Sequence, residues 1–102
     1  MSLKILLVCS NGMSTSLLQQ NIIRYAKSVN IETEVKAYPA VEAKGIFQDW
    51  DVILLGPQVG YELANFKELT TTIPVAIIPA NIYAMGKGKE TLQFAQELLT
   101  KK

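Results

Sequence analysis

Apolar residues gather in four short runs, and the stretches between these runs carry apolar positions at helical spacing. The runs cover residues 4–8, 32–38, 51–55 and 74–78. The first, third and fourth are nearly continuous, which is typical of strands buried on both faces of a parallel sheet. The second run alternates between polar and apolar positions, which predicts a strand at the edge of the sheet.

The stretches between the runs predict helices at residues 16–29, 41–47, 61–69 and 89–100. The first has apolar residues on one face: Leu18, Ile22, Tyr25, Ala26 and Val29. A repeated strand-helix order predicts an α/β fold with a parallel sheet and helices on both faces. Right-handed crossovers in a short chain favour a four-stranded, doubly wound sheet of the flavodoxin-like or Rossmann-like kind, in the order 2-1-3-4.

The composition predicts one globular domain over residues 1–102, because 49% of the residues are hydrophobic. The net charge of +1 gives no indication of binding to nucleic acid or to a membrane surface. No apolar run approaches the roughly 18 residues that span a bilayer. The first residues lack the apolar region of a signal peptide, so a cytoplasmic location is expected.

The chain has a single cysteine, Cys9, and no histidine. A lone cysteine forms no disulfide within the chain, and the lack of histidine argues against a structural zinc site. We therefore expect neither a metal site nor a cofactor. Mechanisms that pair serine or cysteine with histidine need that histidine to come from a partner.

Cys9 ends the first apolar run, and a loop of mostly small residues separates it from the first predicted helix. Loops of this kind direct backbone N–H groups into one concavity at a helix N-terminus, which favours a thiolate or a phosphate. The predicted sheet order also places Cys9 at the carboxyl-end crevice where ligands bind. The sequence predicts Cys9 as a nucleophile and the following residues as a phosphate-binding loop: Ser10, Asn11, Gly12, Met13, Ser14, Thr15 and Ser16.

Other interpretations of these residues exist. A free cysteine often packs as a small buried hydrophobe, and Ser14, Thr15 or Ser16 would suit a helix N-cap.

The loop lacks the glycine patterns of nucleotide-binding and dinucleotide-binding loops. Low-molecular-weight tyrosine phosphatases have arginine at the sixth residue after the cysteine, where this chain has Thr15. Because that guanidinium would stabilise charge during hydrolysis, its absence favours a thiol that passes phosphate on.

The run from Cys9 to Ser16 resembles the phosphorylation loop of IIB components of the bacterial phosphoenolpyruvate-dependent sugar phosphotransferase system (PTS), in the lactose/cellobiose branch. The segment Leu54-Leu-Gly-Pro-Gln58, followed by Tyr61, resembles the third-strand loop of the same branch. The resemblance covers nearly the whole chain. It implies a PTS EIIB-type domain with the sheet order given above.

The resemblance further implies that Cys9 accepts a phosphoryl group from a phosphohistidine of a IIA protein and acts as a protein-cysteine phosphotransferase. The acceptor would be a sugar, expected to be a β-linked disaccharide such as cellobiose or lactose, bound by the membrane component IIC. Two alternatives remain open: a small hydrolase of the Cys-phosphatase kind, and a non-catalytic flavodoxin-like binding module. The sequence leaves open whether Gln58, Tyr83 or Met85 contacts the phosphoryl group or a partner.

Overall fold

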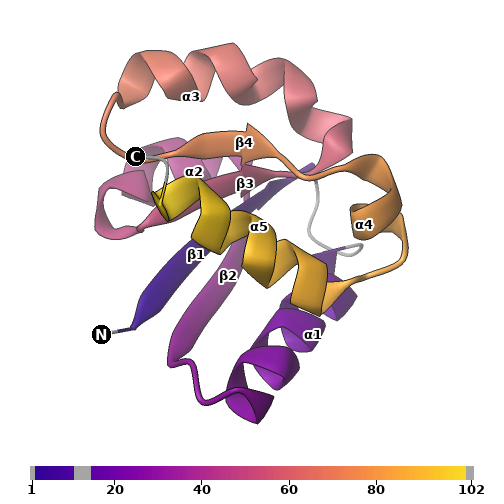
Figure 1. Ribbon diagram of the computed structural model, residues 1–102. Helices are drawn as coiled ribbons and strands as arrows, with labels where there is room; N and C mark the ends of the chain where they lie inside the picture. Colours follow the sequence, from indigo (N-terminus) through magenta and orange to yellow (C-terminus); the bar gives the residue numbers. More distant parts are fainter. Residues whose placement is uncertain (1, 11–14, 101–102) are drawn as a thin grey trace.

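The computed structural model describes residues 2–10 and 15–100 and contains a four-stranded parallel sheet in the order β2-β1-β3-β4 (Figure 1). The strands are β1 (Leu3–Cys9), β2 (Thr33–Pro39), β3 (Val52–Leu55) and β4 (Val75–Ile77). β1 pairs in parallel with β2 and β3, and β3 pairs with β4. The predicted fold class and strand order are confirmed.

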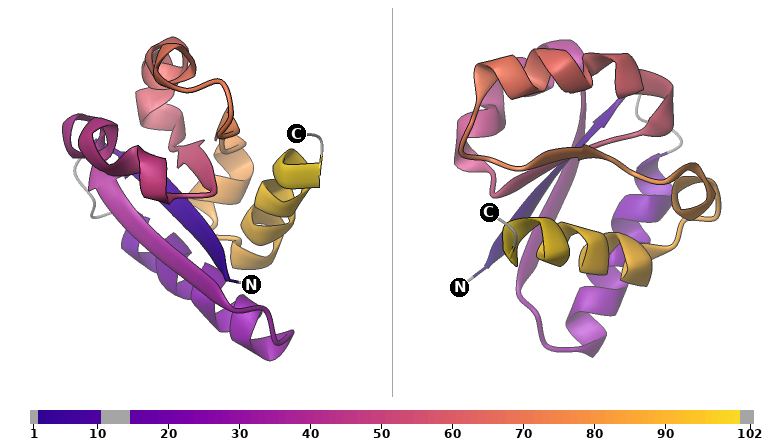
Figure 2. Two further views of the ribbon diagram at one scale, coloured as in Figure 1. Left: turned by 90° about the vertical axis from the view of Figure 1, so that its left-hand side faces the viewer. Right: turned by 45° about the horizontal axis from the view of Figure 1, so that its top comes forward.

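Helices cover both faces of the sheet (Figure 2). The helices are α1 (Thr15–Ser28), α2 (Ala40–Ile46), α3 (Leu63–Leu69), α4 (Ala80–Ala84) and α5 (Gly88–Thr100), with 3₁₀ segments η1 (Phe47–Asp49) and η2 (Pro57–Glu62). One apolar cluster joins the sheet to α1, α4 and α5, and a second joins it to α2, α3 and the two 3₁₀ segments. Among the helices of the described residues, none is long and apolar enough to cross a membrane.

β1 lies at the centre of both apolar clusters, because successive side chains of a strand point to opposite faces. Ile5 and Leu7 belong to the cluster on the α1/α5 face, whereas Leu6 and Val8 belong to the cluster on the α2/α3 face. All four side chains are fully buried. This double burial explains why the first apolar run is continuous.

The edge strands differ from one another in how well the sequence predicted them. The alternating second run forms β2 at one edge, as expected. The fourth run was expected to be buried on both faces, and this is wrong: β4 is the other edge, and its residues are half-buried or exposed. Ile77 is 37% exposed, because an edge strand has a neighbour on one side only.

Two helix predictions also need correction. α4 was not predicted, because five residues are too few to show a helical period. Val29 was expected on the buried face of the first helix, but α1 ends one residue earlier and Val29 is exposed. The chain leaves the helical direction at Asn30, two residues after the end of α1, where φ is a left-handed 59° and the Ile31 N–H bonds back to the Ala26 carbonyl at 2.9 Å.

Candidate functional site

Cys9 is the last residue of β1, which lies between β2 and β3 in the sheet. Its side chain is 2% exposed, and its thiol donates a weak hydrogen bond to the Tyr38 carbonyl, with a sulfur–oxygen distance of 3.7 Å. Cys9 is paired in register with Pro39, and the preceding residue, Val8, is paired with Leu55. The strands therefore place the thiol at the carboxyl end of the sheet, beside the point where the strand order reverses.

The structure describes the two ends of the predicted phosphate-binding loop. Ser10 is exposed directly after β1, and α1 begins at Thr15, with Ser16 exposed in its first turn. The central residues of the prediction lie outside the described part of the chain: Asn11, Gly12, Met13 and Ser14. The order of strand, connecting segment and helix agrees with the prediction, and the roles of the loop residues remain predictions.

The segment after β3 runs beside the end of β1, because the Gly56 N–H bonds to the Val8 carbonyl at 2.9 Å. Gly56 is buried, and a Cβ at this position would lie 3.0 Å from Gln58 Oε1 and 3.2 Å from Tyr83 Cε1. Glycine therefore lets these two side chains approach the backbone closely. Tyr83 is buried in the core, whereas Gln58 is exposed.

Several exposed apolar side chains follow the carboxyl ends of the strands. They lie in the first turn of α1, in the first turn of α2, in η2 and directly after α4: Leu17, Val41, Tyr61 and Met85. Met85, which the sequence left unassigned, is 68% exposed. Other apolar side chains are exposed elsewhere on the protein, such as Val29 and Leu69, and single exposed apolar residues are normal on protein surfaces.

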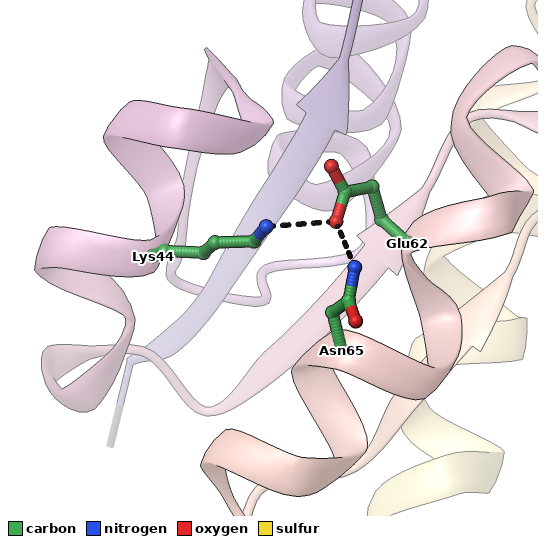
Figure 3. A network of polar contacts seen from close by, with 3 residues as sticks. All are labelled: Lys44, Glu62 and Asn65. Atoms are coloured by element: carbon green, nitrogen blue, oxygen red, sulfur yellow. Dashed lines mark hydrogen bonds and ion pairs between the residues drawn. The ribbon is translucent and has the colours of Figure 1, made fainter.

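A polar network on the α2/α3 face was not predicted from the sequence (Figure 3). The Lys44 ammonium lies 2.8 Å from Glu62 Oε1, and the Asn65 amide donates to the same oxygen at 2.8 Å. These hydrogen bonds, from Asn65 first and then Lys44, lower the pKa of the Glu62 carboxyl, against the effect of burial, which raises it. Lys44 and Glu62 belong to different elements, so no local pattern reveals the pair.

The fold and site together define a small α/β protein with one thiol at the end of the first strand of a parallel sheet. A family model described as "PTS system, Lactose/Cellobiose specific IIB subunit" matches residues 4–94. The chain belongs to this family of sugar phosphotransferase subunits, which confirms the resemblance seen in the sequence.

Individual relatives agree with this assignment. The chain is 36% identical to the oligo-beta-mannoside-specific EIIB component of Bacillus subtilis (strain 168), over 94% of this chain and 95% of the relative. It is 31% identical to the cellobiose-specific EIIB component of Lactococcus lactis subsp. lactis (strain IL1403), over 93% and 94% of the two chains. These names support a IIB phosphocarrier of a sugar phosphotransferase system.

Solved structures show the same fold. The solution structure of a cellobiose-specific phosphotransferase IIB component from Borrelia burgdorferi superposes with a TM-score of 0.83 at 38% identity, covering 100% of this chain and 95% of that one. The lactose-specific IIB domain from Streptococcus pneumoniae has a TM-score of 0.85 at 21% identity, covering 95% and 97%. The second similarity concerns the fold alone.

Proposed function

We propose that Cys9 is the residue that carries the phosphoryl group, and that residues 10–16 bind its oxygens. The observation that supports this most strongly is the position of the single cysteine at the carboxyl end of β1, ahead of α1. The chain has no histidine that could carry the group instead. The N-terminus of α1 would favour the negative charge of a bound phosphoryl group.

The donor is a phosphohistidine of a IIA protein, and the acceptor is a sugar hydroxyl held by the membrane component IIC. In the first step, the Cys9 thiolate attacks phosphorus, the S–P bond forms, and the N–P bond breaks with its electron pair returning to the imidazole. In the second step, the sugar oxygen attacks phosphorus, the S–P bond breaks with its electron pair returning to sulfur, and the hydroxyl proton is released. Catalysis is mainly a matter of positioning and electrostatics.

The partners and the sugar follow from the same proposal. The exposed apolar residues at the carboxyl end of the sheet, such as Val41 and Tyr61, suit contact with the IIA and IIC proteins. The names of the oligo-beta-mannoside and cellobiose relatives support a β-linked disaccharide or related sugar as the acceptor, whereas a third relative, at 31% identity, is named galactose-specific. The IIB protein would act at the cytoplasmic side of the membrane.

Incubation with phosphorylated IIA tests this proposal. Wild-type protein should gain an acid-labile phosphate on Cys9, located by mass spectrometry. Cys9→Ser should gain none while keeping its circular dichroism spectrum, because a serine hydroxyl is not ionised near neutral pH without an activating base. Release of free phosphate would support the phosphatase alternative. If the protein neither gains phosphate on Cys9 nor releases free phosphate, the result indicates a binding module. Phosphate on the folded serine variant would contradict the role of Cys9.

A further inference from the structure

The two segments that flank the end of β1 are joined by an ion pair on the α2/α3 face. β1 lies between β2 and β3, α2 follows β2, and η2 follows β3. Lys44 extends from α2 to Glu62, the last residue of η2, across 2.8 Å (Figure 3). The pair therefore links the segments on either side of the strand that ends at Cys9.

This contact lies at the edge of the packed interface between α2 and η2. The Glu62 side chain is 13% exposed and the Lys44 side chain 34%, and the exposed Asn65 donates a hydrogen bond to the same carboxylate oxygen that Lys44 contacts. The Lys44 ammonium also lies 5.9 Å from the ring centroid of Phe66, which is fully buried. Both ions lose part of their hydration here, so apolar residues of similar size would often hold two elements together equally well. Apolar packing has no preferred direction. An ion pair with a second hydrogen bond is directional, so it favours one spacing of α2 and η2.

The linked segments also contact the end of β1 itself. Val8, the residue before Cys9, packs in one buried cluster with Ala43 of α2 and Val59 of η2. Pro39, at the N-cap of α2, pairs with Cys9 in the sheet. Gly56, at the N-cap of η2, donates its N–H to the Val8 carbonyl. A shift of α2 relative to η2 would therefore change the surroundings of the thiol.

We propose that Lys44 and Glu62 are positioning residues, whose ion pair sets the spacing of α2 and η2 around Cys9 for phosphoryl transfer. This inference rests on the proposed function of Cys9. Neither residue acts on the phosphoryl group directly. Because small misplacements of reacting groups lower rates strongly, loss of the pair should lower the kcat of phosphoryl acceptance about tenfold.

The experiment compares Lys44→Met and Glu62→Gln with wild-type protein, using phosphorylated IIA as the donor. Methionine keeps an apolar chain over Phe66 and removes the charge. Both variants should show the lower kcat with KM changed less than about twofold, as expected when only the transition state is affected. The variant with the reversed pair, Lys44→Glu with Glu62→Lys, should recover at least half of the loss in kcat, measured on a logarithmic scale. Lys67→Met, which removes an exposed lysine of α3, is the matched control and should keep the wild-type rate.

A double variant, Lys44→Met with Glu62→Met, separates positioning from simple packing. We expect it to unfold at about the same urea concentration as wild-type protein while its kcat stays low. Recovery of kcat in this apolar variant would overturn the inference, and so would a normal kcat in both single variants. A raised KM with an unchanged kcat would overturn it as well, because that result indicates a docking contact.

Alkylation of Cys9 by iodoacetamide provides a readout that needs no phosphate. The thiol is buried, so a changed spacing of α2 and η2 should raise its alkylation rate about threefold in Lys44→Met and leave it unchanged in Lys67→Met. Equal alkylation rates in all variants would contradict the positioning role. If wild-type protein accepts no phosphate from IIA, the proposed function of Cys9 fails, and the alkylation rates still decide whether the pair controls the surroundings of the thiol.

Discussion

The two faces of the sheet hold their helices by different means. On the α1/α5 face, the helices approach until backbone meets backbone, and a glycine makes this possible. On the α2/α3 face, aromatic side chains fill the interface and an ion pair joins the segments. The backbone contact joins groups that have no rotamer freedom, whereas the ion pair sets the spacing of its two segments through side chains. The face with the backbone contact carries α1, the helix that follows the predicted phosphate-binding loop.

The backbone contact on the α1/α5 face centres on Gly88, the first residue of α5. A Cβ there would lie 2.3 Å from the carbonyl carbon of Asn21 and 2.4 Å from its oxygen. The Asn21 amide also donates to the Gly86 carbonyl at 2.6 Å, and Gly86 adopts a left-handed φ of +60°. Two glycines and one amide therefore fix α1 against the turn that leads into α5.

The largest effect should come from Gly88→Ala. The added methyl group meets helix backbone, which has no side-chain freedom to move aside, so α1 and α5 must separate. We expect a loss of about 3 kcal/mol in the free energy of unfolding, at the upper end of the range for overpacked sites. Urea denaturation followed by circular dichroism measures this loss.

The matched control for this substitution lies on the other face. A Cβ on Gly45, within α2, would meet nothing within 4 Å. Gly45→Ala should therefore stabilise the protein by about 0.5–1 kcal/mol, since alanine favours a helix more than glycine does. Similar values for the two substitutions would contradict the distinction between the faces.

A smaller difference should appear between two asparagines. Asn21→Ala leaves the part-buried Gly86 carbonyl without the amide and should cost about 1–2 kcal/mol of unfolding free energy. Asn65→Ala removes an exposed hydrogen bond to Glu62, which keeps Lys44, and should cost about 0.5 kcal/mol or less. Thermal unfolding of both variants measures the difference, and a larger loss for Asn65→Ala would reverse the comparison.

The smallest expected effect is the contribution of Glu62 to the pH dependence of stability. The hydrogen bonds from Asn65 and Lys44 lower the folded-state pKa of Glu62 below the usual glutamate value of about 4.3. The ionised carboxylate therefore stabilises the fold above this value, and the contribution is lost as pH falls through the lowered pKa. Carboxyl groups titrate between about pH 6 and about pH 3. Over this range, urea denaturation should show a steeper loss of unfolding free energy for wild-type protein than for Glu62→Gln. Parallel losses would show that the network contributes no acid dependence.

Sequence patterns predicted those parts of the fold and site that depend on neighbouring residues. The apolar run that ends at Cys9 identified both β1 and the position of the thiol, because a strand and its last residue are adjacent in the chain. The stripe on α1 was confirmed at Leu18, Ile22 and Ala26, which are buried. α4 was not predicted because its five residues are too few to show the repeat of apolar positions that identifies a helix.

The sequence by itself determined the strand-helix order, the family and the place of the single cysteine, because hydrophobic periodicity and motifs are local properties of the chain. Only the tertiary structure decided that β4 is exposed at an edge, that Gly88 lies against Asn21, and that Lys44 meets Glu62. Each of these three features depends on segments that are separated in sequence. The distances between such segments exist only after the sheet has assembled and the helices have packed on its faces.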